Sequence, residues 1–501
     1  MQGPASLGIR SIQGRSRAAR ARLTDAVDSR LASTQWRRQA VLVAIAVGIS
    51  LFMIRVLGAA WPTHFKIFFP DSFSFKNAAR DTPLSLRFYA DERPLAYPTL
   101  LFILGRSTVV TVVVQTLLYA LAFVGLAVTA WRLLRHPVTQ AVAVPLLVLL
   151  GLQSRFALWN SHILSESLGI TLGVVSVVAW WRFSAQPNHG ALRWAALLSI
   201  AWLTVRDSNV PPWLAIGVPG LLIASRLCTS LDVSLRRAML RWALITLAVG
   251  VFAALAQSAN GRNRFATMNN VGQRVLVEPE ITSWFVDQGM PMSDALRERT
   301  GFSSFDNDWK MLNSADLVAF RAWADDVGQR QMLLAYARFA PHWLDKLGDD
   351  LPLLLGANQS AYDAFGVAKR LPGPLPFQQG GPTTSVGLKI WVAAAVVGLA
   401  FAVTRRRGQF TVLGLLLAST FVDVYMAYVG DSVEVQRHMV GPLSRMAVVL
   451  MLCVLVGADS AIDHWRTAMA AARATRYAVP PIVPPTVAPT VPTAEWEVSR
   501  D

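Results

Sequence analysis

The chain has 501 residues, of which 53% are hydrophobic and only 16% are charged, and its mean hydropathy is +0.40. Because an ordinary soluble protein carries about 25% charged residues, this composition excludes a soluble multidomain enzyme and excludes disorder over most of the chain. The remaining class is an all-α polytopic membrane protein, in which the net charge of +16 is expected to follow the membrane topology.

The chain begins with a basic segment, residues 1–40, which holds eight Arg and two Asp. An apolar run follows it at once, which favours a cytoplasmic head and a retained first span over a transit peptide. Ten apolar runs predict about ten transmembrane helices, at 41–59, 108–131, 138–152, 166–183, 191–205, 210–226, 241–258, 385–404, 408–429 and 440–459. With ten spans both termini are cytoplasmic, and every Arg-rich loop falls on that side of the plasma membrane.

Two long polar segments are then expected outside the cell. The first is the loop 60–107, which lies within the transmembrane module 41–258. The second is an insertion, 259–383, in which twelve Lys and Arg stand against fourteen Asp and Glu. Apolar residues recur at helical spacing in its second half, so we expect a mainly helical extracytoplasmic domain. Further transmembrane helices follow in 384–460, and then a cytoplasmic Pro-rich tail in 461–501.

Motifs of soluble enzymes are absent from the sequence. It has no P-loop, no dinucleotide-binding glycine pattern, no zinc-protease motif and no nucleophile elbow, and its seven His are not at metal-ligand spacing. Cys228 and Cys453 are far apart in apolar runs and indicate small buried side chains. Nucleic-acid binding also lacks a motif, because topology already explains the basic excess.

Ionisable residues gather instead at the expected outer ends of the spans, where charge is costly and usually functional. Five segments carry them: PDSFSFKNAARDTPLS (70–85), DERPLAYPTLLFIL (91–104), WNSHILSESLGITLG (159–173), LTVRDSNVPPW (203–213) and GDSVEVQRHMVGP (430–442). In the third segment, His162 and Glu166 are four residues apart, which predicts that both lie on one face of a helix.

The order of these segments resembles the glycosyltransferase C superfamily, the integral membrane enzymes that use polyprenyl-phosphate-linked sugar donors. Those enzymes have an acidic residue in the first outer loop, an Arg-x-Pro-x-Tyr-Pro-like element before the next span, a Ser/Thr-Glu or Thr-Asp pattern heading a later span, a Thr-Arg turn and a late Arg. This chain has PDSFSFKNAA, ERPLAYPTLL, LSESLGITL, LTVRDSN and VQRHMVGP in that order. The resemblance covers roughly 41–225 and, more loosely, the last spans. Asp71 departs from it in having no adjacent second acid.

The chemistry of such a transfer assigns roles to these residues. An acceptor hydroxyl must lose a proton as it attacks the sugar, and we expect the Asp71 carboxylate to take it. Glu166 is the second expected catalytic residue, placed to position the acceptor or to orient an arginine. The leaving group is a phosphate, for which arginine is suited. The expected substrate-binding residues are Glu92, Arg93, Tyr97, Arg206, Arg437 and His438.

Structural roles remain open for the same residues. Asp71 could cap a helix, Arg93 could anchor at the membrane interface, and Glu166 could pair with His162. Local ion pairs, Arg206 with Asp207 and Arg437 with Glu434, explain those arginines equally well. Four tryptophans of the insertion could stack on sugars, although such residues are more often core or interface belt: Trp284, Trp309, Trp323 and Trp343.

The resemblance therefore implies a membrane glycosyltransferase that moves a sugar from a polyprenyl-phosphate donor to a glycan, glycolipid or glycoprotein acceptor on the outer face, with inversion. A transporter or flippase for a lipid-linked substrate is one alternative, and a non-catalytic scaffold for envelope synthesis is another. No metal ligands are predicted, and a divalent cation requires that Asp71 meet a second carboxylate in space. The sugar, the linkage, the oligomeric state and the role of the insertion are not specified.

Overall fold

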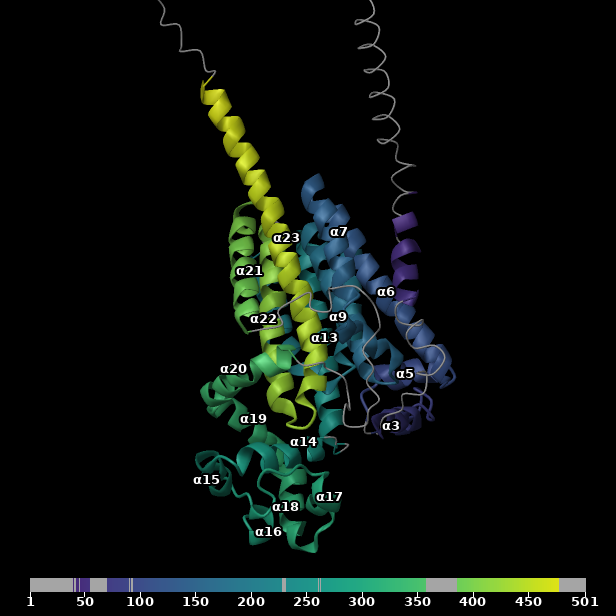
Figure 1. Cartoon of the computed structure of the whole chain (residues 1–501), viewed down its shortest axis with the longest axis vertical. Helices are drawn as coiled ribbons and strands as arrows, with labels where there is room; N and C mark the ends of the chain where they lie inside the picture. The colour runs from purple at the N-terminus through teal and green to yellow at the C-terminus, as the bar shows by residue number, and fades with distance from the viewer. Residues whose placement is uncertain are drawn as a thin grey trace, which may run out of the picture.

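The computed structural model describes residues 39, 42–44, 46–54, 70–89, 91, 93–227, 231–259, 261, 263–356 and 385–476. The described part of the chain is helical throughout and contains no β-strand. Figure 1 shows a bundle of long helices with a set of shorter helices at one end. This architecture confirms the expected helical class.

Within the described residues, six helices are long and apolar enough to cross a membrane: α6 (Thr108–Leu133), α9 (Ser165–Ala185), α13 (Val233–Ala259), α21 (Ser385–Arg405), α22 (Arg407–Gly430) and α23 (Val435–Arg476). Residues Leu42–Ile54, α7 (Pro137–Gly151) and α10 (His189–Leu203) are helical but shorter. The run at 210–226 is divided into α11 (Val210–Pro212), a π-helical turn η3 (Trp213–Gly217) and α12 (Val218–Leu227). Pro211 and Pro212 lie in the first turn of this segment, where a missing backbone donor is tolerated, and the backbone stays helical through η3.

Helix α23 lies at the centre of the bundle. Its most apolar 18-residue stretch is 89% buried, whereas those of α13 and α21 are only 22% and 28% buried. It packs closely on α21, because a Cβ placed on Gly457 would stand 2.1 Å from the Cα of Gly398. Such close backbone approach is how small residues hold membrane helices together. The exposed apolar faces of α13 and α21 are the ones available to lipid.

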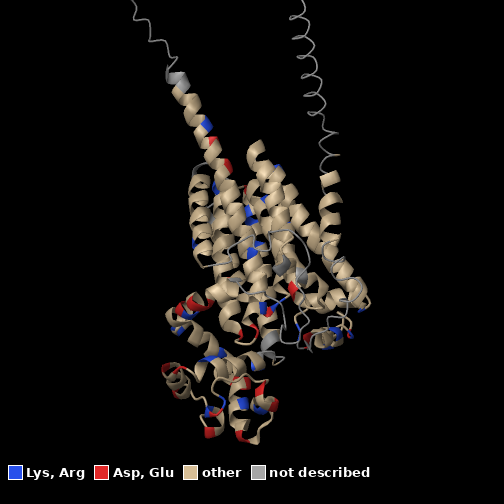
Figure 2. Ribbon diagram, in the orientation of Figure 1, with Lys and Arg blue, Asp and Glu red and all other residues tan. Residues whose placement is uncertain are grey.

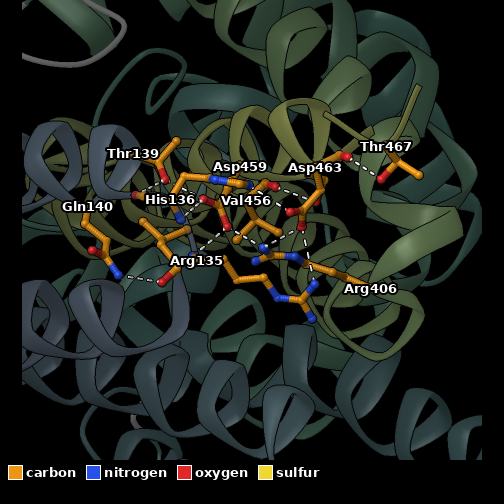
Figure 3. A network of polar contacts seen from close by, with 11 residues as sticks. Arg135, His136, Thr139, Gln140, Arg406, Val456, Asp459, Asp463 and Thr467 are labelled. Carbon is orange, nitrogen blue, oxygen red and sulfur yellow. Dashed lines mark hydrogen bonds and ion pairs between the residues drawn. The ribbon is translucent and has the colours of Figure 1, made fainter. Parts of the chain in front are cut away.

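A buried polar network joins two helix–helix turns to α23 (Figure 3). Asp459 of α23 accepts hydrogen bonds from the backbone N–H groups of Arg135 and His136, from the Thr139 hydroxyl and from the Arg406 guanidinium. His136 also lies 2.8 Å from Asp463. The network ties the α6–α7 and α21–α22 turns to α23, which continues to Arg476, beyond the expected end of the C-terminal spans at 460.

The described parts of the loop 60–107 and of the insertion 259–383 lie at the end of the bundle opposite this network (Figure 1). The loop forms α3 (Pro70–Ala78), α4 (Leu86–Tyr89) and α5 (Ala96–Ile103), and short turns α8 (Ser154–Ala157), η1 (Leu158–Ser161) and η2 (Asp207–Asn209) precede α9 and α11. The insertion comprises α14 (Asn263–Asn270), η4 (Val271–Val275), α15 (Pro279–Asp287), α16 (Asp294–Arg297), α17 (Asp306–Asn313), η5 (Ala315–Leu317), α18 (Val318–Trp323), η6 (Ala324–Gly328), α19 (Gln329–Arg338) and α20 (Ala340–Gly356).

Side-chain amides dock the insertion on the α22–α23 turn. Asn270 donates to the Val429 and Gly430 carbonyls at 3.1 and 3.0 Å, and Asn269 donates to the Asp431 carboxylate at 3.0 Å. These bonds satisfy the last carbonyls of α22, which have no partner within the helix. Figure 2 shows many acidic and basic residues in the insertion and at this end of the bundle. The insertion is thereby fixed to the turn that precedes Arg437.

Candidate functional site

Three side chains of helix α3 contact Arg93. Pro70 at its start suits the fixed backbone of a first helical turn, and Asp71 follows in that turn. The Asp71 carboxylate accepts a hydrogen bond from the Arg93 Nη2 at 2.7 Å, and the Ser74 hydroxyl accepts one from the Arg93 Nε at 2.7 Å. The same guanidinium lies 4.9 Å from the centre of the Phe75 ring. The i, i+3, i+4 spacing of a helix places all three side chains on one face.

Arg437, in the first turn of α23, joins three carboxylates. Its Nη2 donates to Asp71 at 2.6 Å, its Nε to Glu166 at 2.6 Å and its Nη1 to Glu434 at 2.7 Å. The planar guanidinium can do this because its donors point in fixed, different directions. The Arg437 side chain is 7% exposed and Glu166 is fully buried, whereas Asp71 and Glu434 keep 25% and 26% exposure. Asp71 and Glu434 therefore form the accessible side of the cluster.

Arg206 and His438 complete the cluster on its buried side. The Arg206 Nη2 lies 3.9 Å from Glu166 and 2.7 Å from the His438 Nδ1. Because arginine is only a donor, the His438 Nδ1 must accept, so this imidazole is neutral and carries its proton on Nε2. A backbone bond from Ala96 to the Thr204 carbonyl, at 3.0 Å, holds the segment after Arg93 against the one before Arg206.

The electrostatics separate the two accessible carboxylates. Burial alone would raise the pKa of Asp71, but Arg437 and Arg93 outweigh it and hold this pKa well below its ordinary value of 3.8. Burial raises the pKa of Glu434 above its ordinary value of 4.5, and Arg437 only partly offsets that rise. Asp71 therefore stays ionised at neutral pH, and Glu434 is the more basic of the two when the site is empty.

Six of the eight expected site residues belong to this one network: Asp71, Arg93, Glu166, Arg206, Arg437 and His438. Tyr97 does not face its open side. The Tyr97 ring is fully buried 5.1 Å from the Phe75 ring, and its hydroxyl donates to Gln115 at 3.3 Å, so it supports α3 from beneath. Glu92 lies outside the described residues.

The prediction that His162 and Glu166 lie on one face of a helix is wrong. Helix α9 begins at Ser165, and His162 has an extended backbone with φ −105° and ψ 141°. The spacing of four residues gave a wrong prediction because the helix starts between the two positions, so only Glu166 is helical. Glu166 instead holds Arg437, which matches the second role expected for it, orienting an arginine.

The local pair of Arg437 with Glu434 is present, but it is one of three pairs around that guanidinium. Sequence reasoning did not select Glu434 as a site residue, although its spacing of three from Arg437 was a signal. Glu434 has φ 54°, a left-handed conformation that is costly for a residue with a side chain and that often marks functional sites.

A second charged pair lies within the spans. Arg445 of α23 is 3.6 Å from Asp423 of α22 and donates to the Ser419 hydroxyl at 2.8 Å. Its guanidinium also lies 4.3 Å from the Trp202 ring. Sequence reasoning missed Arg445, for which an arginine inside an apolar run was the available signal.

The tryptophans of the insertion divide between core and surface. Trp323 is buried against Phe320 and Phe285, and Trp284 contacts Phe285, so these two serve the core. Trp309 is 49% exposed, and Trp343 is buried on the wall of a cavity. Of the four residues expected to stack on sugars, Trp343 is thus the one that lines a cavity.

Among the residues that the structure describes, no group of three or more His, Cys, Asp or Glu side chains is arranged to hold a metal ion. In the cluster, the Arg437 guanidinium occupies the space between Asp71, Glu166 and Glu434. Models of known protein families give no match to the sequence, and neither do curated proteins.

Proposed function

We propose that the chain is a plasma-membrane glycosyltransferase that moves a sugar from a polyprenyl-phosphate donor to a cell-envelope glycan, glycolipid or glycoprotein. The observation that carries the proposal is the joining of Asp71, Arg93 and Arg437, from three distant segments, in one partly exposed cluster. The topology that goes with it has about ten spans, cytoplasmic termini and the cluster on the outer face.

The arginines of the cluster supply a binding site for the donor phosphate. Arg93 and Arg437 each hold one oxygen of Asp71, so the carboxylate fills the position that a phosphate would take. A phosphate offers more oxygens and more charge than a carboxylate and competes well for guanidinium groups. We infer that the donor displaces Asp71 from one or both arginines when it binds.

Displacement changes the chemistry of Asp71. Without its arginines the carboxylate has a higher pKa, because the cations that stabilise its charge now face the phosphate. Asp71 then accepts the proton of the acceptor hydroxyl as that oxygen bonds to the anomeric carbon. The bond from that carbon to the phosphate oxygen breaks, its electron pair goes to the phosphate, and polyprenyl phosphate leaves against Arg93 and Arg437. A single displacement of this kind inverts the anomeric configuration.

The other charged residues support this step. Glu166 is a positioning residue, since it is fully buried and reaches the reacting groups only through Arg437. Glu434 is the second candidate for the base because it is accessible and its pKa is raised by burial. A divalent cation is not required by this scheme, because the arginines carry the charge that the leaving phosphate needs.

The polyprenyl tail has an apolar surface beside the cluster. Helix α5 follows Arg93 directly, and its last turn exposes Phe102 and Ile103. At the end of a membrane span such side chains lie in the acyl region of the bilayer, where a prenyl chain also resides. The donor can therefore keep its lipid in the membrane while its phosphate reaches Arg93.

A transfer assay tests the proposal. The full chain, reconstituted in nanodiscs, is offered radiolabelled polyprenyl-phosphate sugars with an envelope lipid extract, and nucleotide sugars serve as the comparison donors. We expect transfer from a lipid-linked donor only, and a loss of about tenfold or more in Arg93→Gln. Arg80→Gln is the matched control, because Arg80 is exposed at the end of α3. Transfer that is equal in both variants would oppose the role of Arg93.

A transporter is the second candidate, and the Asp423–Arg445 pair favours it. Charges buried within membrane spans often mark a substrate or proton path. The Asp423 Oδ1 and the Arg445 Nε lack hydrogen-bond partners among the described residues, as groups on such a path would. Uptake of a lipid-linked sugar into vesicles, abolished by Asp423→Asn and without transfer, would favour the transporter over the enzyme. Binding of the donor with neither transfer nor uptake would favour a scaffold.

A further inference from the structure

A cavity of about 390 Å³ lies between the insertion and the α22–α23 turn. Its volume falls in the range of about 300–1,000 Å³ that is usual for small-molecule sites. Its walls come from η4, α20 and the outer end of α22, and include Arg274, Trp343, Lys346, Asp350 and Tyr428. The cavity is separate from the cluster around Arg437 and has no role in the mechanism above.

Three buried donors on its walls have no hydrogen-bond partner among the described residues. They are the Arg274 Nη1, the Trp343 Nε1 and the Ser432 Oγ. Buried polar groups are nearly always paired in folded proteins, so three unpaired donors in the wall of one cavity favour a bound molecule with acceptor atoms, which reaches them only when the wall side chains shift because each donor is buried. Burial also lowers the pKa of the Arg274 side chain, whose guanidinium lies 4.6 Å from the Tyr428 ring.

The charges of the cavity are balanced. Arg274 and Lys346 face Glu278 and Asp350, and Lys346 lies 3.2 Å from Glu278. The Tyr428 hydroxyl donates to Asp350 at 2.6 Å. A site without excess positive charge gives no advantage to a phosphate or another anion. Carboxylates can accept from hydroxyl groups while the unpaired donors bond to hydroxyl oxygens, so the walls match a neutral polyol.

Aromatic side chains on the cavity walls also suit a sugar ring. Trp343 and Tyr428, together with Val277 and Val435, supply apolar surface beside the hydrogen-bonding groups of the cavity. A sugar ring has the same two-sided character, with C–H groups on its faces and hydroxyls around its rim. We propose that the cavity binds a neutral oligosaccharide. That this saccharide is the acceptor rests on the proposed function, and binding itself does not.

The position of the cavity supports the acceptor role. Ser432 and Val435, which line it, flank Glu434 in the turn that leads to Arg437. Glu434 bonds to Arg437, and Arg437 bonds to Asp71. An oligosaccharide bound against Ser432 therefore contacts the turn that carries Glu434 and leads to Arg437.

The test is binding of short neutral oligosaccharides of hexose and pentose units to the full chain in nanodiscs, measured by saturation-transfer NMR and titration. Ser432→Ala with Trp343→Phe removes two unpaired donors and keeps the ring. We expect binding about tenfold weaker, because two ligand hydrogen bonds are lost. Folding stability should be unchanged or higher, because the removed groups have no partner within the protein. Trp309→Phe, at an exposed position, is the matched control and should bind as the wild type does.

Three results would overturn the inference: no oligosaccharide binds, the double variant binds as tightly as the wild type, or inorganic phosphate displaces the saccharide. Asp71→Asn separates this inference from the proposed function, since it should bind saccharide normally while losing transfer. A wild type that binds saccharide but transfers none would end the proposed function and keep the cavity site. Transfer by the double variant with unaltered acceptor affinity would end the cavity site and keep the proposed function.

Discussion

Replacing Arg437 by methionine is expected to destabilise the protein strongly. The substitution keeps a long side chain but removes three charge-assisted hydrogen bonds at once, to Asp71, Glu166 and Glu434. Asp71 retains Arg93, and both Asp71 and Glu434 are exposed enough to recover water. Glu166 is fully buried, and its nearest remaining cation is Arg206 at 3.9 Å. The uncompensated charge of Glu166 therefore dominates the cost.

Removing one partner of a buried ion pair costs about 3–5 kcal/mol, and we expect Arg437→Met to fall in that range. Arg437→Lys keeps the charge but not the three-way geometry, so its cost should be intermediate. The double variant Arg437→Met, Glu166→Gln should recover part of the loss, because the buried charge is then gone.

The assay is the midpoint of unfolding by denaturing detergent in mixed micelles, followed by circular dichroism. Arg330→Met on α19 is the control, since Arg330 is exposed and its loss should change stability by no more than about 0.5 kcal/mol. A cost of less than about 1 kcal/mol for Arg437→Met, or no rescue in the double variant, would refute the account of Arg437 as the centre of the cluster.

Three further predictions concern packing, the opposite end of the bundle and pH. Gly457→Val should cost about 1–3 kcal/mol in the same assay, because its side chain would overlap Gly398, while Gly414→Ala, whose Cβ meets nothing within 4 Å, should be near neutral. Asp459→Asn should lower the free energy of unfolding by about 2–4 kcal/mol, since it weakens four hydrogen bonds and leaves the buried Arg406 guanidinium with Asp463, at 3.5 Å, as its remaining anionic partner. The pKa of Asp71 is lowered on folding, so the stability lost in Asp71→Asn should be constant above about pH 4 and shrink only as the pH falls below 3.8; a loss that shrinks already near pH 6 would contradict the pairing.

The helices could be predicted from the sequence because an apolar run is a local pattern. Each of the ten runs coincides at least in part with described helix, but six of the helices have the length of a span. The difference arises where the apolar run is short, as in α7 and α10, or where a π-helical turn interrupts the α-helix, as in η3. Span count therefore depends on local backbone chemistry that hydropathy alone does not weigh.

Several residues of the site could be predicted from the sequence, but the contacts between them could not. Charge at the ends of spans identified Asp71 and Arg437, yet 366 residues separate the two partners, and no local pattern encodes such a contact. His438 was expected to bind substrate, but its neutral state could not be predicted, because it follows from the Arg206 donor on its Nδ1. The role of Glu166 likewise depended on where α9 begins, three residues after His162.

Glycosyl transfer by Asp71→Asn, compared with the wild type and Asp81→Asn, tests the central claim most directly. Asp81 lies just beyond the end of α3 and outside the cluster, so its variant controls for the loss of an acid in the same loop. With folded protein in nanodiscs and a labelled polyprenyl-phosphate sugar, single-turnover transfer should fall by about a hundredfold or more in Asp71→Asn and stay at the wild-type rate in Asp81→Asn. Equal transfer by Asp71→Asn and the wild type would contradict the assignment of Asp71 as the base.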